Sequence, residues 1–141
     1  WSSDVCSSDL TIEVKRFDHL VITVADVERT CAFYERVLGF KVVTFKGTRK
    51  ALHFGAQKIN LHQKGHEFDP KAATPTVGAI DVCFVVETPL DAVVAHLRAC
   101  HVTIEEGPVE RTGAQGPIRS VYIRDPDNNL IELANQLPAR T

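Results

Sequence analysis

Residues 120–135 read SVYIRDPDNNLIELAN, a pattern of two strands joined by a turn. The turn is built from Asp, Pro and Asn, which favour tight turns. In the second strand the side chains alternate, so Ile131 and Leu133 share one face and Glu132 lies on the other. Taking a lone carboxylate out of water costs several kcal/mol, so such a group is protonated, paired or metal-bound. Glu132 is therefore predicted to meet a partner.

A strand with the same alternation lies near the start of the chain. Residues 17–24 read FDHLVITV. Their apolar face is formed by Leu, Ile and Val at alternate positions, and His19 lies on the opposite face. Two further predicted strands, 58–62 and 79–86, alternate in the same way. Six residues are predicted to face a common cavity: His19, Asn60, His62, Asp81, Cys83 and Glu132.

The chain follows one plan twice: a strand, a helix and then three shorter strands. The first copy covers 17–62, with a helix that begins after the N-cap Asp26 and ends at Gly39. The second copy covers 79–135, with a helix capped by Thr88. The remaining predicted strands cover 41–45, 51–54, 58–62, 102–105, 118–124 and 130–134. This repeat predicts an α+β fold in which two βαβββ modules form an open mixed-sheet barrel with the helices outside.

Composition limits the class of protein. The chain has 141 residues, 44% of them hydrophobic and 24% charged, and a net charge of -2. These values are typical of one globular domain and give no sign of a nucleic-acid or membrane partner. The four cysteines are widely spaced without a CxxC pair, which favours a reducing cytoplasm over a disulfide framework. Residues 1–10, WSSDVCSSDL, join no later pattern and are predicted to be non-native, so the single domain is expected to span 11–141.

The cavity residues are of types that suit a metal ion. Two imidazoles and one or two carboxylates match the ligands of divalent iron, manganese, nickel or zinc. The predicted ligands are His19, His62, Asp81 and Glu132. Two carboxylates would balance the 2+ charge, whereas without a metal they repel each other. For each residue alone the alternative is a structural role, such as a hydrogen-bonded strand histidine or an Asp81 that binds backbone.

Three motifs carry a family resemblance: FDHLVITVADVERTCAFYERVLGF at 17–40, KINLHQ at 58–63 and RDPDNNLIELAN at 124–135. Together they resemble the vicinal oxygen chelate superfamily of glyoxalase I, fosfomycin resistance proteins, methylmalonyl-CoA epimerase and extradiol dioxygenases. The likeness is closest to the small subgroup called glyoxalase domain-containing protein 5. It implies that His19 and Glu132 are the first and last metal ligands. It also implies that His62 lies in the third-ligand strand, with Asn60 as the alternative in register. Members with four protein ligands often carry His where this chain has Asp81.

By this resemblance the chain is expected to be a metal-dependent enzyme of lyase or isomerase type, in which vicinal oxygens of a small substrate chelate the metal. Glu132 would be the catalytic carboxylate that moves a proton on carbon, with Asp81 as the alternative, provided that the carboxylate leaves the metal or never binds it. Two other functions stay open, an extradiol-type dioxygenase and a non-catalytic protein that sequesters drugs. A small molecule is the expected partner, nucleic acid and membrane are not, and a homodimer is left open.

Smaller expectations concern segments around this cavity. Residues 107–120 are rich in Gly and Pro and are predicted to form a flexible lid. Arg49 and Lys50 are expected to be solvated turn residues, and the Cys83 thiol is expected to have no catalytic role. His101 stands at a helix end where Gly would be easier.

Overall fold

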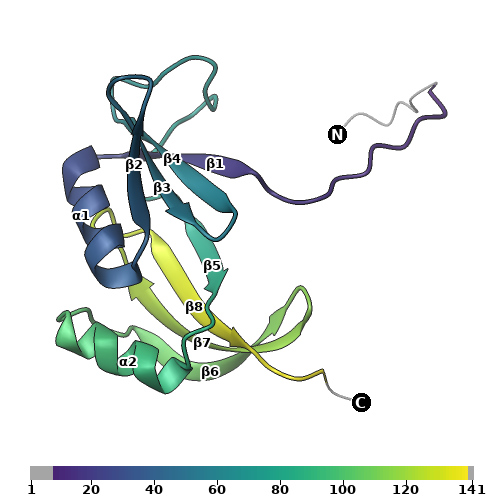
Figure 1. Ribbon diagram of the computed structural model, residues 1–141, viewed down its shortest axis with the longest axis vertical. Helices are drawn as coiled ribbons and strands as arrows, with labels where there is room; N and C mark the ends of the chain where they lie inside the picture. Colours follow the sequence, from purple (N-terminus) through teal and green to yellow (C-terminus); the bar gives the residue numbers. More distant parts are fainter. Residues whose placement is uncertain (1–7, 140–141) are drawn as a thin grey trace.

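The computed structural model describes residues 8–139 (Figure 1). The first module contains β1 (His19–Val24), α1 (Val27–Leu38), β2 (Lys41–Phe45), β3 (Arg49–Phe54) and β4 (Gln57–Gln63). The second module contains β5 (Asp81–Val85), α2 (Leu90–Ala99), β6 (Glu106–Gly113), β7 (Gly116–Arg124) and β8 (Leu130–Gln136). Residues 1–7 of the segment predicted to be non-native lie outside the described residues. Between residues 8 and 139 no helix has the length and hydropathy of a membrane span.

Each module forms its own four-stranded mixed sheet. The strand orders are β1-β4-β3-β2 and β5-β8-β7-β6. In each sheet the first and last strands of the module pair in parallel, and the other pairs are antiparallel. A parallel pair needs a long crossover, which the helix and the two intervening strands supply. Helix α1 packs on β2, β3 and β4, and α2 packs on β7. The predicted α+β repeat of two βαβββ modules is therefore confirmed.

Helix α1 begins and ends where the sequence predicts. The Asp26 side chain accepts a hydrogen bond from the backbone N–H of Arg29 at 3.1 Å. Gly39 ends the helix in the left-handed conformation, with φ of 69°. The helix buries one stripe, formed by Thr30, Cys31, Tyr34 and Val37. This spacing places all four side chains on the face that meets the sheet.

Helix α2 begins differently from the prediction. Pro89 is the N-cap, so the prediction that Thr88 caps the helix was wrong. The backbone N–H of Leu90 instead donates to the side-chain oxygen of Asn135 in β8, at 2.7 Å. This acceptor comes from the end of the module, so the sequence around the helix start does not reveal it. At the other end of α2, His101 adopts a positive φ of 59°, as expected where glycine would be easier.

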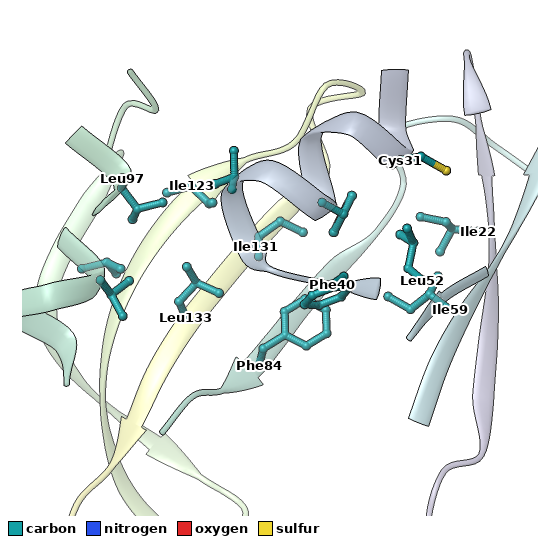
Figure 2. Packing of buried hydrophobic residues seen from close by; sticks show 14 of the residues in the cluster. Ile22, Cys31, Phe40, Leu52, Ile59, Phe84, Leu97, Ile123, Ile131 and Leu133 are labelled. Atoms are coloured by element: carbon teal, nitrogen blue, oxygen red, sulfur yellow. The ribbon is translucent and has the colours of Figure 1, made fainter. Parts of the chain in front are cut away.

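One hydrophobic core spans both modules (Figure 2). Three phenylalanine rings meet where the modules join, with centroid distances of 4.8 Å between Phe40 and Phe54 and 5.2 Å from each to Phe84. Stacked and edge-to-face contacts of this kind bury large apolar areas. The strand residues predicted to be core-facing lie in the same cluster: Ile22, Val24, Ile59, Leu61, Phe84, Ile131 and Leu133.

The segment after α2 departs from the prediction. Residues 102–105, predicted as a strand, have no strand conformation. Residues 107–120, predicted as a flexible lid, instead form most of the β6–β7 hairpin. The pairing register shifts around Pro108, and β6 is an edge strand. Edge strands and bulges tolerate proline, so the Gly- and Pro-rich composition is compatible with paired strands here.

The turn between β7 and β8 ties the two modules together. Asp125 is buried, and its carboxylate accepts a hydrogen bond from the hydroxyl of Tyr34 in α1 at 2.8 Å. The same carboxylate accepts from the side-chain amide and backbone N–H of Asn129, at 2.9 and 3.0 Å, and from the backbone N–H of Asp127 at 2.9 Å. Burial, followed by the charge of Asp125, raises the pKa of Tyr34 far above its ordinary value. The tyrosine therefore remains a hydrogen-bond donor.

The linker between the modules is fastened to the same turn. The backbone N–H of Ile80 donates to the side-chain oxygen of Asn129 at 2.9 Å, and the N–H of Leu130 donates to the Ile80 carbonyl at 2.9 Å. Gly78 approaches the turn so closely that a Cβ there would lie 2.7 Å from the carbonyl oxygen of Asp127. These contacts fix the start of β5 relative to β8.

Replacing Asp125 is expected to destabilise the fold more than removing any one of its donors. Asp125→Ala leaves four donors without their acceptor and should lower the free energy of unfolding by about 3 kcal/mol or more. Tyr34→Phe removes one bond to a charged group and should cost about 1–2 kcal/mol. Urea denaturation measures both, with exposed Asp69→Ala as the control. An Asp125→Ala variant as stable as this control would contradict the assigned role.

Candidate functional site

Each sheet has one face in the core and one open face. In the first sheet the β1–β4 register places Val21 opposite Asn60 and Thr23 opposite His62. The side chains of the first open face include His19, Val21, Thr23, Phe45, Arg49, Lys58, Asn60 and His62. The predicted strand faces of His19, Asn60 and His62 are therefore the observed ones.

The second sheet has an open face of the same construction. The β5–β8 register places Asp81 opposite Leu130 and Cys83 opposite Glu132, and β7 places Tyr122 on the other side of Glu132. The side chains of the second open face include Asp81, Cys83, Val85, Arg111, Ser120, Tyr122 and Glu132. Asp81 and Glu132 thus share a face, as the alternation predicts.

The two open faces place polar residues at equivalent positions. His19 lies two residues before Val21, the partner of Asn60. Asp81 likewise lies two residues before Cys83, the partner of Glu132. Each polar pair is therefore offset by about 7 Å along its strands, since a strand rises about 3.3 Å per residue. The second-sheet pair of carboxylates corresponds to His19 and Asn60 in the first sheet.

His62 does not occupy the equivalent position. It lies four residues beyond Lys58, the partner of His19, which is about 13 Å along the strand. Asn60 lies only two residues beyond Lys58. The sequence offers both Asn60 and His62 as the third metal ligand, and the observed register favours Asn60 as the neighbour of His19.

His19 and Asn60 differ in their surroundings. The side chain of His19 is 43% exposed, and its Nδ1 lies 2.8 Å from a carboxylate oxygen of Asp18. This contact leaves Nε2 for a ligand, the arrangement in which a carboxylate orients a metal-binding histidine. Asn60 has a buried side-chain oxygen with no hydrogen-bond partner among the residues described. Such an orphaned acceptor is rare in proteins and points to a missing partner.

His62 is buried beneath the segment that follows β4. Only 4% of the residue is exposed, and its ring packs edge-on against Phe68 with centroids 5.7 Å apart. Burial, together with the charge of Arg49, lowers the pKa of His62. Arg49 is not the solvated turn residue that was predicted, because its guanidinium lies 3.9 Å from the centroid of the Phe68 ring.

Glu132 is held by hydrogen-bond donors on its own sheet. Ser120 lies beside it on the open face, and its hydroxyl donates to Glu132 Oε2 at 2.5 Å. Burial, then the negative charge of Glu132, raises the pKa of the Cys83 thiol to about 11. Next to Glu132 on the same open face, the hydroxyl of Tyr122 accepts a hydrogen bond from Arg111 Nε at 3.0 Å. Ser120 was not predicted as a site residue, although its parity across the β7–β8 hairpin from Glu132 would have identified it.

The four predicted ligands do not meet in one chain. Over residues 8–139 no three His, Cys, Asp or Glu side chains are placed to share a metal ion. His62 lines a cleft of about 410 Å³ beside β1, whereas Glu132 lines a separate cleft of about 660 Å³ between β5, β8 and the β6–β7 hairpin. The candidate ligands therefore form two groups, which we term half-sites: His19 and Asn60 on the first open face, and Asp81 and Glu132 on the second.

The raised pKa of Cys83 predicts slow alkylation. With a pKa of about 11, much less reactive thiolate is present at pH 8 than for an ordinary thiol, so iodoacetamide should react about ten- to a hundredfold more slowly. Glu132→Gln removes the negative charge, lowers this pKa and should accelerate labelling. Peptide-level mass spectrometry separates Cys83 from Cys31 and Cys100. Equal rates in wild type and Glu132→Gln would show that the carboxylate does not act on the thiol.

Comparison with known proteins identifies the family. The model of the Glyoxalase/Bleomycin resistance protein/Dioxygenase superfamily matches residues 16–133. The virulence protein STM3117 of Salmonella typhimurium is 60% identical over 121 residues, which cover 86% of this chain and 84% of that protein. Its crystal structure matches with a TM-score of 0.88 at 57% identity, covering 89% of this chain and 100% of the crystallised chain. The glyoxalase domain-containing protein RDO1 of Mycosarcoma maydis is 54% identical over 129 residues, covering 92% of this chain and 73% of that protein. The chain therefore belongs to the Glyoxalase/Bleomycin resistance protein/Dioxygenase superfamily.

Proposed function

We propose that this protein is a metal-dependent enzyme of the glyoxalase type, acting on a small molecule with two neighbouring oxygens. The proposed ligands of a divalent iron, manganese, nickel or zinc ion are His19, Asn60, Asp81 and Glu132. The observation that carries the proposal is the equivalent placement of these residues in the two sheets, each pair offset by two residues across parallel strands. In this proposal Asn60 takes the place for which His62 was the first candidate.

The chemistry of the donor set fits a divalent ion. Asn60 offers a buried amide oxygen without a partner, and His19 offers a ring nitrogen opposite the one held by Asp18. Asp81 and Glu132 supply two negative charges, which balance the charge of the ion. Nitrogen and oxygen ligands together suit first-row transition metals and zinc rather than calcium.

We propose that a second copy of the chain completes the site. The two pairs of proposed ligands lie on different open faces of one chain, so the first open face of one copy would meet the second open face of its partner. Such a pairing is self-complementary, because a two-fold axis then forms two identical sites. Apolar side chains support it at the outer strands of both faces, where Val21 is 44% exposed and Val85 is 61% exposed.

Charge also favours this pairing. The first open face carries the cations Arg49 and Lys58 and no carboxylate on its four strands. The second open face carries the carboxylates of Asp81, Glu106 and Glu132 against the cations Arg111 and Arg124, which leaves one net negative charge. Opposite potentials attract the unlike faces and disfavour contact between two second faces.

In the proposed reaction Glu132 is the catalytic carboxylate. Ser120 holds Oε2, so Oε1 is the oxygen that would bind the ion and, when Glu132 leaves the ion, take a proton from a substrate carbon and return it. A bound divalent ion supplies Lewis-acid stabilisation of the negative charge that develops on the substrate oxygens. Asp81, on the same face, serves as the second carboxylate. Proton transfer at carbon is lyase or isomerase chemistry.

Two further assignments belong to the same proposal. Membership of the subgroup glyoxalase domain-containing protein 5 is supported by the three motifs at 17–40, 58–63 and 124–135 and by the similarity to the protein RDO1. A cytoplasmic location is supported by the wide spacing of the four cysteines without a CxxC pair.

A subunit-mixing experiment tests the ligand set and the dimer together. His19→Ala and Glu132→Gln each disable one half-site, so each variant alone is expected to bind little metal. Dimers formed from an equal mixture of the two should recover about a quarter of the wild-type metal content, since half of them then have one intact site of two. Elemental mass spectrometry measures the metal, and sedimentation velocity measures the dimer.

The controls use residues on the same faces. His53→Ala and Glu106→Gln should leave the metal content unchanged, because neither occupies an equivalent register position. A mixture that stays empty while wild type is loaded would refute a site shared between copies. A wild type that contains no metal and takes up none when it is added would overturn the enzyme proposal and favour a binding protein that sequesters small molecules.

A further inference from the structure

The cleft beside β1 has not been assigned a role. It lies between β1, the end of β4 and the linker that leads to β5, and its volume is about 410 Å³. We term it the His62 cleft, and its walls include Val21, His62, Pro70, Lys71, Pro75 and Ile80. The volume and the mostly apolar walls are those of a site for a small organic molecule.

His62 is a polar group of this cleft whose ring makes no hydrogen bond within residues 8–139. The residue is 96% buried, since only 4% of it is exposed. Its ring contacts Phe68, and neither ring nitrogen makes a hydrogen bond to any residue from 8 to 139. An imidazole always carries at least one N–H donor. Among the described residues the buried side-chain polar atom without a partner is Asn60 Oδ1, so the imidazole nitrogens of His62 open on the cleft instead. A mostly buried imidazole with its N–H open to a cleft is suited to a ligand that accepts a hydrogen bond.

Positive charge predominates around this imidazole. The charged groups that act on His62 are Arg49, Glu67 and Lys71. Arg49 lies over the Phe68 ring, 3.9 Å from its centroid. Lys71 lines the cleft, and its ammonium is 4.0 Å from Glu67, a separation at which a partly exposed ion pair is weak. Two cations against one carboxylate leave a net positive charge beside a hydrogen-bond donor.

We propose that the His62 cleft binds a small carboxylic acid with an apolar body. The carboxylate accepts hydrogen bonds from the imidazole of His62 and from the ammonium of Lys71. The apolar part packs against Val21, Pro70 and Ile80. The net positive charge selects the anion over a neutral molecule of the same shape.

The cleft adjoins the proposed metal site. His62 and Asn60 lie on the same face of β4, two residues or about 7 Å apart. If the bound acid is the substrate, its carboxylate at His62 lies a short distance from the reacting oxygens. That interpretation rests on the proposed function, whereas binding of the acid in the cleft does not require a metal.

Calorimetric titration of the full chain with benzoate, after removal of metal by a chelator, tests the proposal. Benzoate is expected to bind saturably at pH 7. Its neutral counterpart benzamide is expected to bind at least about tenfold more weakly. Lys71→Met and His62→Phe should each weaken benzoate binding by about tenfold or more, since each removes one charged hydrogen bond. His66→Phe is the matched control, because His66 is exposed and does not line the cleft.

His62→Phe retains an aromatic ring against Phe68, and its thermal unfolding shows whether the variant is folded. Lys71→Met changes a partly exposed side chain and gives a second test if His62→Phe is unstable. The proposal is overturned if wild type does not bind benzoate, if benzamide binds equally well, or if Lys71→Met binds benzoate as wild type does. His19→Ala should lose metal yet bind benzoate normally, so failure of the metal site and failure of the acid site are distinguishable.

Discussion

The buried carboxylate of Asp125 is the contact on which the arrangement of the two modules depends. Removing a carboxylate from water is unfavourable unless donors replace the water, and here one donor comes from Tyr34 in the opposite module. The surrounding turn adds a second layer of contacts, since Arg29 donates to the Pro126 carbonyl at 3.1 Å and to Asp127 at 3.3 Å. The modules are thus joined by a polar network at the surface of a shared apolar core.

This junction brings the helices together and leaves the open faces uncovered. Both helices lie on the same side of the molecule (Figure 1), and His96 of α2 contacts the carbonyl of Val37 in α1 at 2.8 Å. Neither open face is covered by a helix of its own chain, because each helix packs on the core face of its sheet. The two clefts lie on these uncovered faces, with His62 lining the first and Glu132 lining the second.

Much of the fold could be predicted from local pattern, because alternation in strands and capping at Asp26 depend on neighbouring residues. What local pattern missed depends on residues distant in sequence. Asn135 caps a helix that precedes it by 45 positions, and Arg49 packs on Phe68 in the segment after β4. Strand parity placed the site residues on the correct faces. Strand parity could not show whether Asn60 or His62 lies beside His19, because both residues have the same parity. Only the pairing register of β1 and β4 distinguishes them.

The two modules are alike in topology and unlike in charge at their equivalent positions. Where the first carries a histidine and an amide, the second carries two carboxylates. A duplicated unit whose halves had stayed identical could pair with itself in several orientations of similar energy. These two positions, together with Arg49 and Lys58 on the first open face, make the two open faces of the chain unequal in charge. In the proposed dimer, this difference in charge would favour contact between unlike faces over the other contacts that the symmetry of the repeat allows.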